Sequence, residues 1–350
     1  MKKLILIPLL VFALGANSQE ANKNYSFSLE QAISHALTNN YSAINAGRDI
    51  ASAKQKKWET TAAGLPQINA GLDYGNNFAY TLQGVTGGGP FGGDPGEVST
   101  IAFGTKHNMN ARATLSQLLF DGSYIVALQA SKTYLKFYEN AKQKTDVEIK
   151  EAVINSYGNV LLAAESISIL EKNKAILEKT FSDTKETFKN GLIEEENVEQ
   201  LQITLSTINS TLNNTKRLLV IANNMLKILL GIDINDDLRL TDQLDNLTVT
   251  NLDLSISQKD FNVSNNIDYQ MGLNFQEQRQ LEYKLQKSKA LPSLGANVNF
   301  GYNAFANQFA FFTPSQKWNN FSNLGIGLNV PVFSSLGRSA KTQQAKIAFE

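Results

Sequence analysis

The sequence contains no cysteine, which excludes disulfide bonds, thiolate metal sites and a lipid-modified N-terminal cysteine. Its two histidines, His35 and His107, lie far apart in the chain without metal-ligand spacing, so structural or surface roles fit them better. Lys and Arg (32 residues) balance Asp and Glu (32 residues), and no basic run indicates a nucleic-acid partner. Nothing in the composition points to a cofactor.

Catalytic motifs are also missing. The sequence contains no Ser/His/Asp or Cys/His pattern, and no metal-spaced cluster. The glycine run 87–89 precedes Pro90 rather than a helix, so it lacks the context of a phosphate-binding loop. We therefore expect a protein that is not an enzyme.

Residues 1–18 have the pattern of a secretory signal peptide. Lys2 and Lys3 precede an apolar core over residues 4–14, and small residues at 16–18 suit cleavage before Gln19. A transmembrane anchor fits less well, because such a helix needs about 20 apolar residues. We expect an exported protein. No later stretch is expected to cross a bilayer as a helix, so membrane insertion would use β-strands.

The longest predicted feature is a helical hairpin over residues 121–230 with its turn at Asn190 and Gly191. In its second helix, apolar residues recur at alternating separations of three and four, the signature of a coiled coil. This seam consists of Val198, Leu201, Leu205, Ile208, Leu212, Thr215, Leu219, Ala222, Leu226 and Leu229. An unbroken helix of about 70 residues would span roughly 100 Å. A hairpin of that length does not fit an ordinary globular domain.

Two segments alternate between apolar and small polar residues, which predicts strands at 66–82 and 293–304. Each strand follows a helix and starts at a Leu–Pro pair, Leu65–Pro66 in one case and Leu291–Pro292 in the other. Further strands are predicted at 106–120 and 321–333. The chain thus contains two helix–strand–strand–helix repeats. These are residues 19–264, with a connector at 231–264, and residues 265–350.

The second repeat contains only the start of its long helix, so we expect roughly 90 further residues if the repeat is faithful. In the first repeat, a capping box at Ser28 and Gln31 predicts a helix to about Asn39. A second helix is expected from about Tyr41 to Ala63. The glycine-rich segment 84–96 is expected to be a loop that does not pack.

The predicted strands have one apolar face and one small polar face, as transmembrane barrel strands do. Four strands cannot close a barrel, and open edges in lipid cost several kcal/mol for each unpaired group. A trimer sharing about 12 strands would leave a wet channel. Aromatic residues near the strand ends are expected to form an interfacial girdle: Phe78, Tyr80, Phe305, Phe309, Phe311, Phe312, Trp318 and Phe321. The alternative is a soluble β-sandwich whose core is the apolar face.

Together, these features resemble the TolC-type outer-membrane factor family, the exit ducts of tripartite efflux pumps and type I secretion. The resemblance rests on residues 28–32 followed by 37–40, on both Leu–Pro strand starts, and on residues 328–333. It implies an α+β membrane protein, a homotrimer with a shared transmembrane β-barrel in outer-membrane lipid and a long coiled-coil α-helical barrel in the periplasm. The implied function is passive conduction with a periplasmic adaptor and an inner-membrane transporter. Type I protein secretion and a non-channel coiled-coil surface protein are the alternatives.

The resemblance also assigns a docking site. Asn190, Gly191 and Leu192 resemble the family's Val–Gly–Leu helix tip, with Asn in place of Val, and this tip docks the adaptor. Four acidic residues follow it: Glu194, Glu195, Glu196 and Glu199. They are interpreted either as a cation-favouring cluster at the entrance or as a solvated first helical turn stabilised by the helix dipole. The family's gating carboxylates belong to the second hairpin, which this sequence does not contain.

Overall fold

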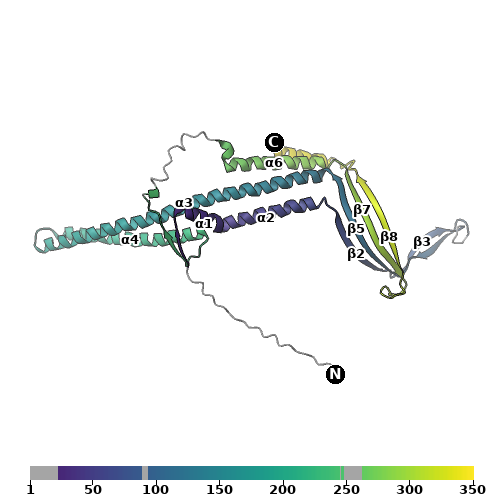
Figure 1. Cartoon of the computed structure of the whole chain (residues 1–350), viewed down its shortest axis with the longest axis horizontal. Helices are drawn as coiled ribbons and strands as arrows, with labels where there is room; N and C mark the ends of the chain where they lie inside the picture. Colours follow the sequence, from purple (N-terminus) through teal and green to yellow (C-terminus); the bar gives the residue numbers. More distant parts are fainter. Residues whose placement is uncertain (1–22, 89–93, 245, 248–261) are drawn as a thin grey trace, which may run out of the picture. The chain divides into compact units, whose positions relative to one another are not determined.

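The computed structural model describes residues 23–88, 94–244, 246–247 and 262–350 (Figure 1). The predicted signal peptide lies outside these residues. The chain divides into two compact units. Unit 1 combines the described residues of Met1–Asn45 and Lys144–Phe261, and unit 2 combines those of Ala46–Gln143 and Asn262–Glu350. This division does not follow the two sequence repeats, because residues 46–143 of the first repeat belong to unit 2 together with the second repeat.

Unit 1 contains most of the predicted hairpin. Helix α3 (Gly122–Lys189) begins in unit 2 and reaches its turn within unit 1, and α4 (Glu195–Leu230) returns antiparallel to it (Figure 1). Helix α1 (Leu29–Asn39) starts at the predicted capping box, in which the Ser28 hydroxyl and the Gln31 side chain each accept a backbone N–H. Helix α2 (Tyr41–Ala62) follows directly and belongs to unit 2 from Ala46 onward. The core combines α1, α3 and α4: Ala32, Ala36, Ile149, Val153, Tyr157, Val160, Leu226 and Leu230.

One expectation about α3 was wrong. By length and composition alone, this helix contains a stretch apolar enough to cross a membrane. Such a composition is weak evidence, because the core helix of a soluble unit has it too. The apolar residues Ile149, Val153 and Tyr157 of α3 are buried in the core of unit 1. Only 28% of the apolar stretch is buried within the described chain, so core packing covers part of it.

A two-stranded parallel sheet joins the ends of unit 1. Strand β1 (Asn24–Phe27) pairs with β6 (Asp237–Leu240), which lies in the connector after α4. Strand β1 was not predicted from the sequence. The reason is that four residues are too few to establish a period of two. Connector residues 245 and 248–261 lie outside the described part of the chain.

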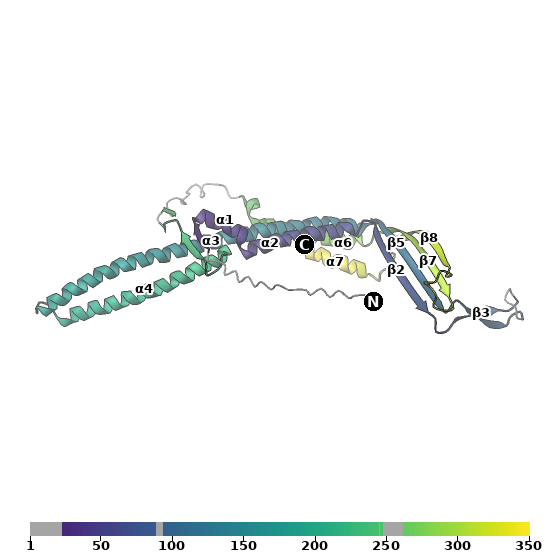
Figure 2. The same ribbon diagram turned by 60° about the horizontal axis from the view of Figure 1, so that its bottom comes forward.

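Unit 2 contains a four-stranded antiparallel sheet in the order β2 (Gln67–Asn76), β5 (His107–Asp121), β7 (Ser293–Ala306) and β8 (Trp318–Asn329) (Figure 2). The strands pair as two hairpins, β2–β5 and β7–β8, and β5 joins β7. Strands β2 and β8 are the two edges. The unit also contains a short 3₁₀ helix (Val263–Asn265), α6 (Ile267–Ser288) and α7 (Gly337–Phe349).

The strand predicted at 66–82 is shorter in the structure, where β2 ends at Asn76. The Asn77 N–H donates to the Lys106 carbonyl (2.8 Å) and its side-chain amide donates to the Thr105 carbonyl (2.9 Å). The chain then enters a separate hairpin of β3 (Thr81–Thr86) and β4 (Val98–Phe103). Part of the segment expected to be an unpacked loop is therefore paired, and residues 89–93 lie outside the described chain. Local periodicity could not identify this distant pairing.

The second predicted strand pair is also shifted. Strand β8 covers Trp318–Asn329 instead of residues 321–333. It ends two residues before Pro331, which has no N–H to donate to a neighbouring strand. Its start is set by pairing of Trp318 with Ala304. The earlier start also changes the position of Phe321, which lies inside the strand rather than at its border.

Candidate functional site

The four-stranded sheet has one apolar face that is largely exposed. Directly paired residues form rows across all four strands, and one such row is Ile68, Leu115, Val298 and Leu324. Its edge members are open: Ile68 is 76% exposed and Leu324 is 68% exposed. Leu72, Phe300, Ile326 and Leu328 extend the face. A continuous exposed apolar surface of this kind indicates contact with an apolar environment or a partner.

The opposite face is polar and made of small residues. A row of Asn69, Thr114, Asn299 and Asn323 crosses the sheet. The Thr114 hydroxyl donates to Asn299 Oδ1 (2.7 Å), and the Asn299 amide donates to Asn323 Oδ1 (2.8 Å). These side chains satisfy one another along the row and leave the remaining groups for water. The sheet therefore separates an apolar surface from a wettable one.

Aromatic residues gather at the loop end of the sheet, on its apolar face. The Tyr74 hydroxyl lies 2.9 Å from His107 Nδ1, and the Tyr74 ring makes edge contacts with Phe309 and Phe311. Phe311 is only 2% exposed, beside Met109 and Trp318. Part of the predicted girdle is therefore a packed cluster.

Two members of the predicted girdle lie elsewhere. Phe305 pairs with Asn108 on the polar face of the sheet. Phe321 lies on the same face over Gly301, where a Cβ atom would come within 2.8 Å of the Phe321 ring. Assigning Phe321 to the girdle was wrong, because β8 starts three residues before it and because Phe321, two residues from Asn323, lies on the polar face. Phe78 and Tyr80 lie between β2 and β3 and are exposed.

The two Leu–Pro strand starts have the same backbone geometry. The Leu65 N–H donates to the Ala62 carbonyl and the Leu291 N–H donates to the Ser288 carbonyl, both at 3.0 Å. Pro66 and Pro292 then precede β2 and β7 directly. Gln117 fixes the first junction by donating to the Gly64 carbonyl (2.8 Å). These pairs thus act as structural stops that turn a helix into a strand.

The hairpin tip is closed by a Schellman motif. Gly191 has a φ of 74°, its N–H donates to the Phe188 carbonyl, and the Leu192 N–H donates to the Thr187 carbonyl. The Asn190 amide donates to the Glu186 carbonyl (2.9 Å). Leu192 is left 74% exposed. The three predicted tip residues are therefore adjacent at the end of the hairpin, with an apolar side chain presented to solvent.

The acidic residues follow the tip at the start of α4. Glu194 is the N-cap residue, Glu195 and Glu196 lie in the first turn, and all are exposed, as is Glu199. Their position suits the positive end of the helix dipole. Among the residues that the structure describes, no group of three or more His, Cys, Asp or Glu side chains could hold a metal ion.

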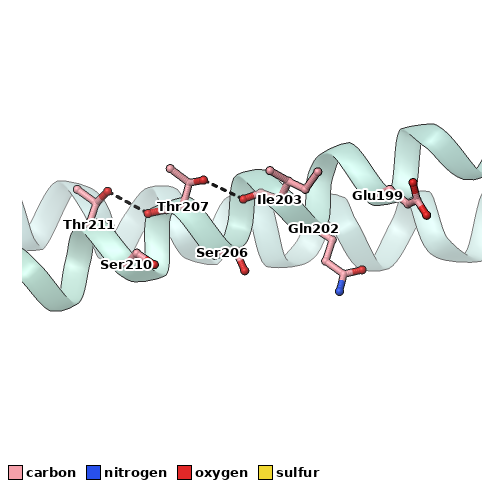
Figure 3. A pocket seen from close by; sticks show the side chains of 7 residues that line it. All are labelled: Glu199, Gln202, Ile203, Ser206, Thr207, Ser210 and Thr211. Carbon is pink, nitrogen blue, oxygen red and sulfur yellow. Dashed lines mark hydrogen bonds between the residues drawn. The ribbon is translucent and has the colours of Figure 1, made fainter.

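Two grooves near the tip are lined by uncharged polar residues for most of their length. One, of about 590 Å³, lies between α3 and α4: Asp183, Thr184, Thr187, Ile193, Asn197, Gln200, Leu201 and Thr204. The other, of about 610 Å³, follows α4 (Figure 3): Glu199, Gln202, Ile203, Ser206, Thr207, Ser210 and Thr211. The hydroxyls of Thr207 and Thr211 donate to the carbonyls one turn earlier. The hydroxyl donors of these threonines are therefore satisfied within their own helix, so this groove needs no ionic partner.

The hairpin has further apolar seams that unit 1 does not cover. On α4, Leu218, Ile221, Met225 and Ile228 recur at separations of three and four and are each more than half exposed. On α3, Val147, Ile154, Leu162, Ile169 and Ile176 recur about every seven residues and are also exposed. Sequence analysis missed both seams, although heptad spacing in α3 was a visible signal. Exposed heptad seams indicate packing against additional helices.

Comparisons with known proteins agree with this geometry. Residues 32–232, more than half of the chain, match the model of the family described as outer membrane efflux protein. The fold is similar to that of CusC, studied for transmembrane channel formation (TM-score 0.69, 18% identity, 95% of this chain and 73% of CusC covered). It is also similar to the Campylobacter jejuni CmeC outer membrane channel (0.66, 19%, 99% and 74%) and to the outer membrane protein VceC of Vibrio cholerae (0.66, 14%, 92% and 72%).

No curated protein matches the chain significantly. The solved structures are less than 25% identical to it, so they show the fold alone. The family match is the stronger finding, because it comes from the sequence and spans both units. The family consists of efflux channels rather than enzymes. The chain belongs to the outer membrane efflux protein family.

Proposed function

We propose that the protein is the outer-membrane duct of a tripartite efflux pump and conducts substrates passively across the periplasm and outer membrane. It acts as a homotrimer with a periplasmic adaptor and an inner-membrane transporter. The observation that carries this proposal is the sheet of unit 2. It has an exposed apolar face, a polar face, and edges at β2 and β8 that no strand in the described chain covers.

Edges of this kind cannot stay open in lipid, where each unpaired backbone group costs several kcal/mol. Strands β2 and β8 run antiparallel to each other, since three antiparallel steps separate them. Edge β8 of one copy can therefore continue onto edge β2 of the next with the alternating order unbroken. Three copies would supply about twelve strands, enough for a water-filled interior.

The exposed seams of α3 and α4 support the same assembly in the periplasm. A helix with apolar seams on two sides packs with two neighbours, which produces a tube rather than a pair. The uncharged grooves would line or border the aqueous side.

The decisive test is conductance. Purified full-length protein would be analysed by native mass spectrometry in detergent and then inserted into planar lipid bilayers. We expect trimers and discrete ion-conducting steps. Trimers that never conduct would instead favour a coiled-coil surface protein, and a monomeric protein would contradict the shared barrel.

The tip proposal is that Asn190, Gly191 and Leu192 dock the adaptor. Its support is the exposed Leu192 held by the Schellman turn. Gly191→Pro would disrupt this turn, because the proline ring fixes φ near −65° whereas Gly191 has a φ of 74°. We expect intact trimers with weaker adaptor crosslinking. Gly158→Ala in α3 is the control, since a Cβ there meets nothing within 4 Å. Unchanged crosslinking of Gly191→Pro would contradict the tip assignment.

A further inference from the structure

The polar face of the sheet carries one pair of opposite charges. All residues of β2, β5, β7 and β8 are described, and their only charged side chains are those of Asp73, Arg112 and Asp121. Asp121 is at the end of β5, where its carboxylate accepts the backbone N–H groups of Ser123 and Tyr124 at the start of α3. Asp73 and Arg112 are the two charged side chains of the sheet that do not cap a helix, and both lie on the polar face.

These two side chains form an ion pair. Arg112 Nη2 lies 3.3 Å from Asp73 Oδ2, and the two side chains are 53% and 61% exposed. Arg112 is directly opposite Gly71, so Asp73 is its diagonal neighbour on β2. Such diagonal positions lie about 7–8 Å apart at their Cα atoms, within reach of a long side chain.

Glycine makes room for this arrangement. A Cβ atom at Gly71 would lie 3.9 Å from Arg112 Nε, so the arginine extends beside the bare backbone of β2. On the other side of Arg112, Gly301 is the next residue of the same row, and the Phe321 ring lies over it. The two largest side chains of this row, Arg112 and Phe321, therefore lie beside glycines.

Stability does not explain the pair. An exposed ion pair contributes little to the stability of the fold, because water and salt screen it. The surrounding positions are asparagine, serine, threonine and glycine, which would suffice for a wettable surface. The effect that remains is electrostatic: the pair fixes the charge of the polar face at zero.

We propose that Arg112 and Asp73 set the ion selectivity of the strand-lined part of the duct. This inference rests on the proposed function, in which the polar face lines the channel. Three copies of the pair form a ring in which each guanidinium neutralises a carboxylate. The ring lets cations and anions pass without preference, and removing either partner leaves three like charges in the lumen. Unpaired charges on a channel lining attract counter-ions and repel like-charged ions.

The test uses full-length channels in planar bilayers with a KCl gradient, and the reversal potential gives the permeability ratio of K⁺ to Cl⁻. Asp73→Asn leaves the three arginines without a partner, so the permeability ratio of K⁺ to Cl⁻ should fall by about threefold or more. The measurement uses 0.1 M salt, at which the charge of a side chain is felt over about 10 Å. Arg112→Gln should raise the ratio by a similar factor. Exchanging the charges, with Asp73→Arg and Arg112→Asp together, should return the ratio towards the original value. All these variants keep the acidic residues of the hairpin tip.

Conducting variants whose ratios match the original, or that shift in the same direction, overturn the proposal. Absence of conductance in the unmutated protein contradicts the proposed function instead. If the single variants form no pores, Asn303→Cys tests the proposal with the Arg112–Asp73 pair unchanged. The chain has no other cysteine, and Asn303 is in the same row as Asp73. If the ring is neutral, cationic and anionic thiol reagents should modify the cysteine in the channel with the same ratio of rates that they show with a free thiol in solution. A ratio that differs from this by about tenfold or more contradicts the proposal.

Discussion

The hydroxyl of Tyr157 on α3 lies 3.0 Å from the carboxylate of Asp242 in the connector. The same hydroxyl donates to the Phe27 carbonyl (3.1 Å), and Asp242 accepts the Leu29 N–H (2.7 Å). The tyrosine is fully buried, and burial is the main cause that raises the pKa of Tyr157 to about 12, with the Asp242 charge adding to it. Three segments distant in sequence therefore meet at one polar contact inside the core of unit 1.

Tyr157→Phe removes the hydroxyl from this contact. Phe27 and Asp242 then lose a hydrogen-bond donor in a partly buried place, which costs about 1–3 kcal/mol. We expect a lower apparent melting temperature of the full-length protein, followed by helical circular dichroism in detergent. Tyr134→Phe is the control, because Tyr134 is 41% exposed and its hydroxyl lies near that of Tyr138 at the surface. Equal effects of both substitutions would contradict a special role of Tyr157.

His35 makes the stability of unit 1 depend on pH. Its ring stacks near Phe27 (4.9 Å between centroids) and Tyr25 (5.8 Å), and burial lowers the pKa of His35 below 6.5. The unfolded chain therefore takes up a proton at His35 more readily than the folded chain. The contribution of His35 to the free energy of unfolding is present above pH 6.5 and is lost as pH falls through the folded pKa. Melting curves between pH 7.5 and 5 should show this loss. In His35→Phe the dependence should be weaker, and an identical pH profile would exclude His35 as its source.

Local signals predicted much of this fold. The capping box at Ser28 required only residues three apart, and the Schellman turn at Gly191 required only the end of one helical pattern and the start of another. Alternation likewise identified four strands. What failed depended on distant partners. The end of β2 is set by Asn77 binding Thr105 and Lys106, and the start of β8 is set by pairing of Trp318 with Ala304. The Arg112–Asp73 pair was invisible for the same reason, because register defines it.

Two glycines with similar backbone conformation should respond differently to alanine. Gly191 and Gly231 have φ values of 74° and 71°, so alanine is strained by about 1 kcal/mol at each. A Cβ at Gly191 meets nothing within 4 Å, whereas at Gly231 it would lie 2.3 Å from the Asn39 carbonyl oxygen. Gly231→Ala must therefore also displace the α1–α2 junction. We expect it to lower stability by a further 1–3 kcal/mol or so, beyond the effect of Gly191→Ala. Equal melting temperatures of the two variants would refute the steric contribution.

The last prediction concerns a buried amide in unit 2. Asn274 on α6 is 2% exposed; its amide donates to the Thr133 carbonyl on α3 (3.2 Å), and its Oδ1 accepts from Gln278 (2.8 Å). A single buried asparagine between helices favours one axial register over the alternatives. Asn274→Ala should cost about 1–3 kcal/mol, because Thr133 and Gln278 lose their partner.

If Asn274 also sets the register between α3 and α6, replacing it should change how the two helices align and not only how stable they are. Asn274→Leu should retain helix content, because an apolar residue satisfies the packing, but several registers should then coexist. Paired cysteines on α3 and α6, introduced into this cysteine-free chain, would report register by crosslinking at positions one turn apart. We expect one crosslink in the Asn274 protein and several in Asn274→Leu. The exposed Gln276→Ala on the same helix is the control and should keep the single crosslink. A single crosslink in Asn274→Leu would leave shape complementarity, and not the amide, as the determinant of register.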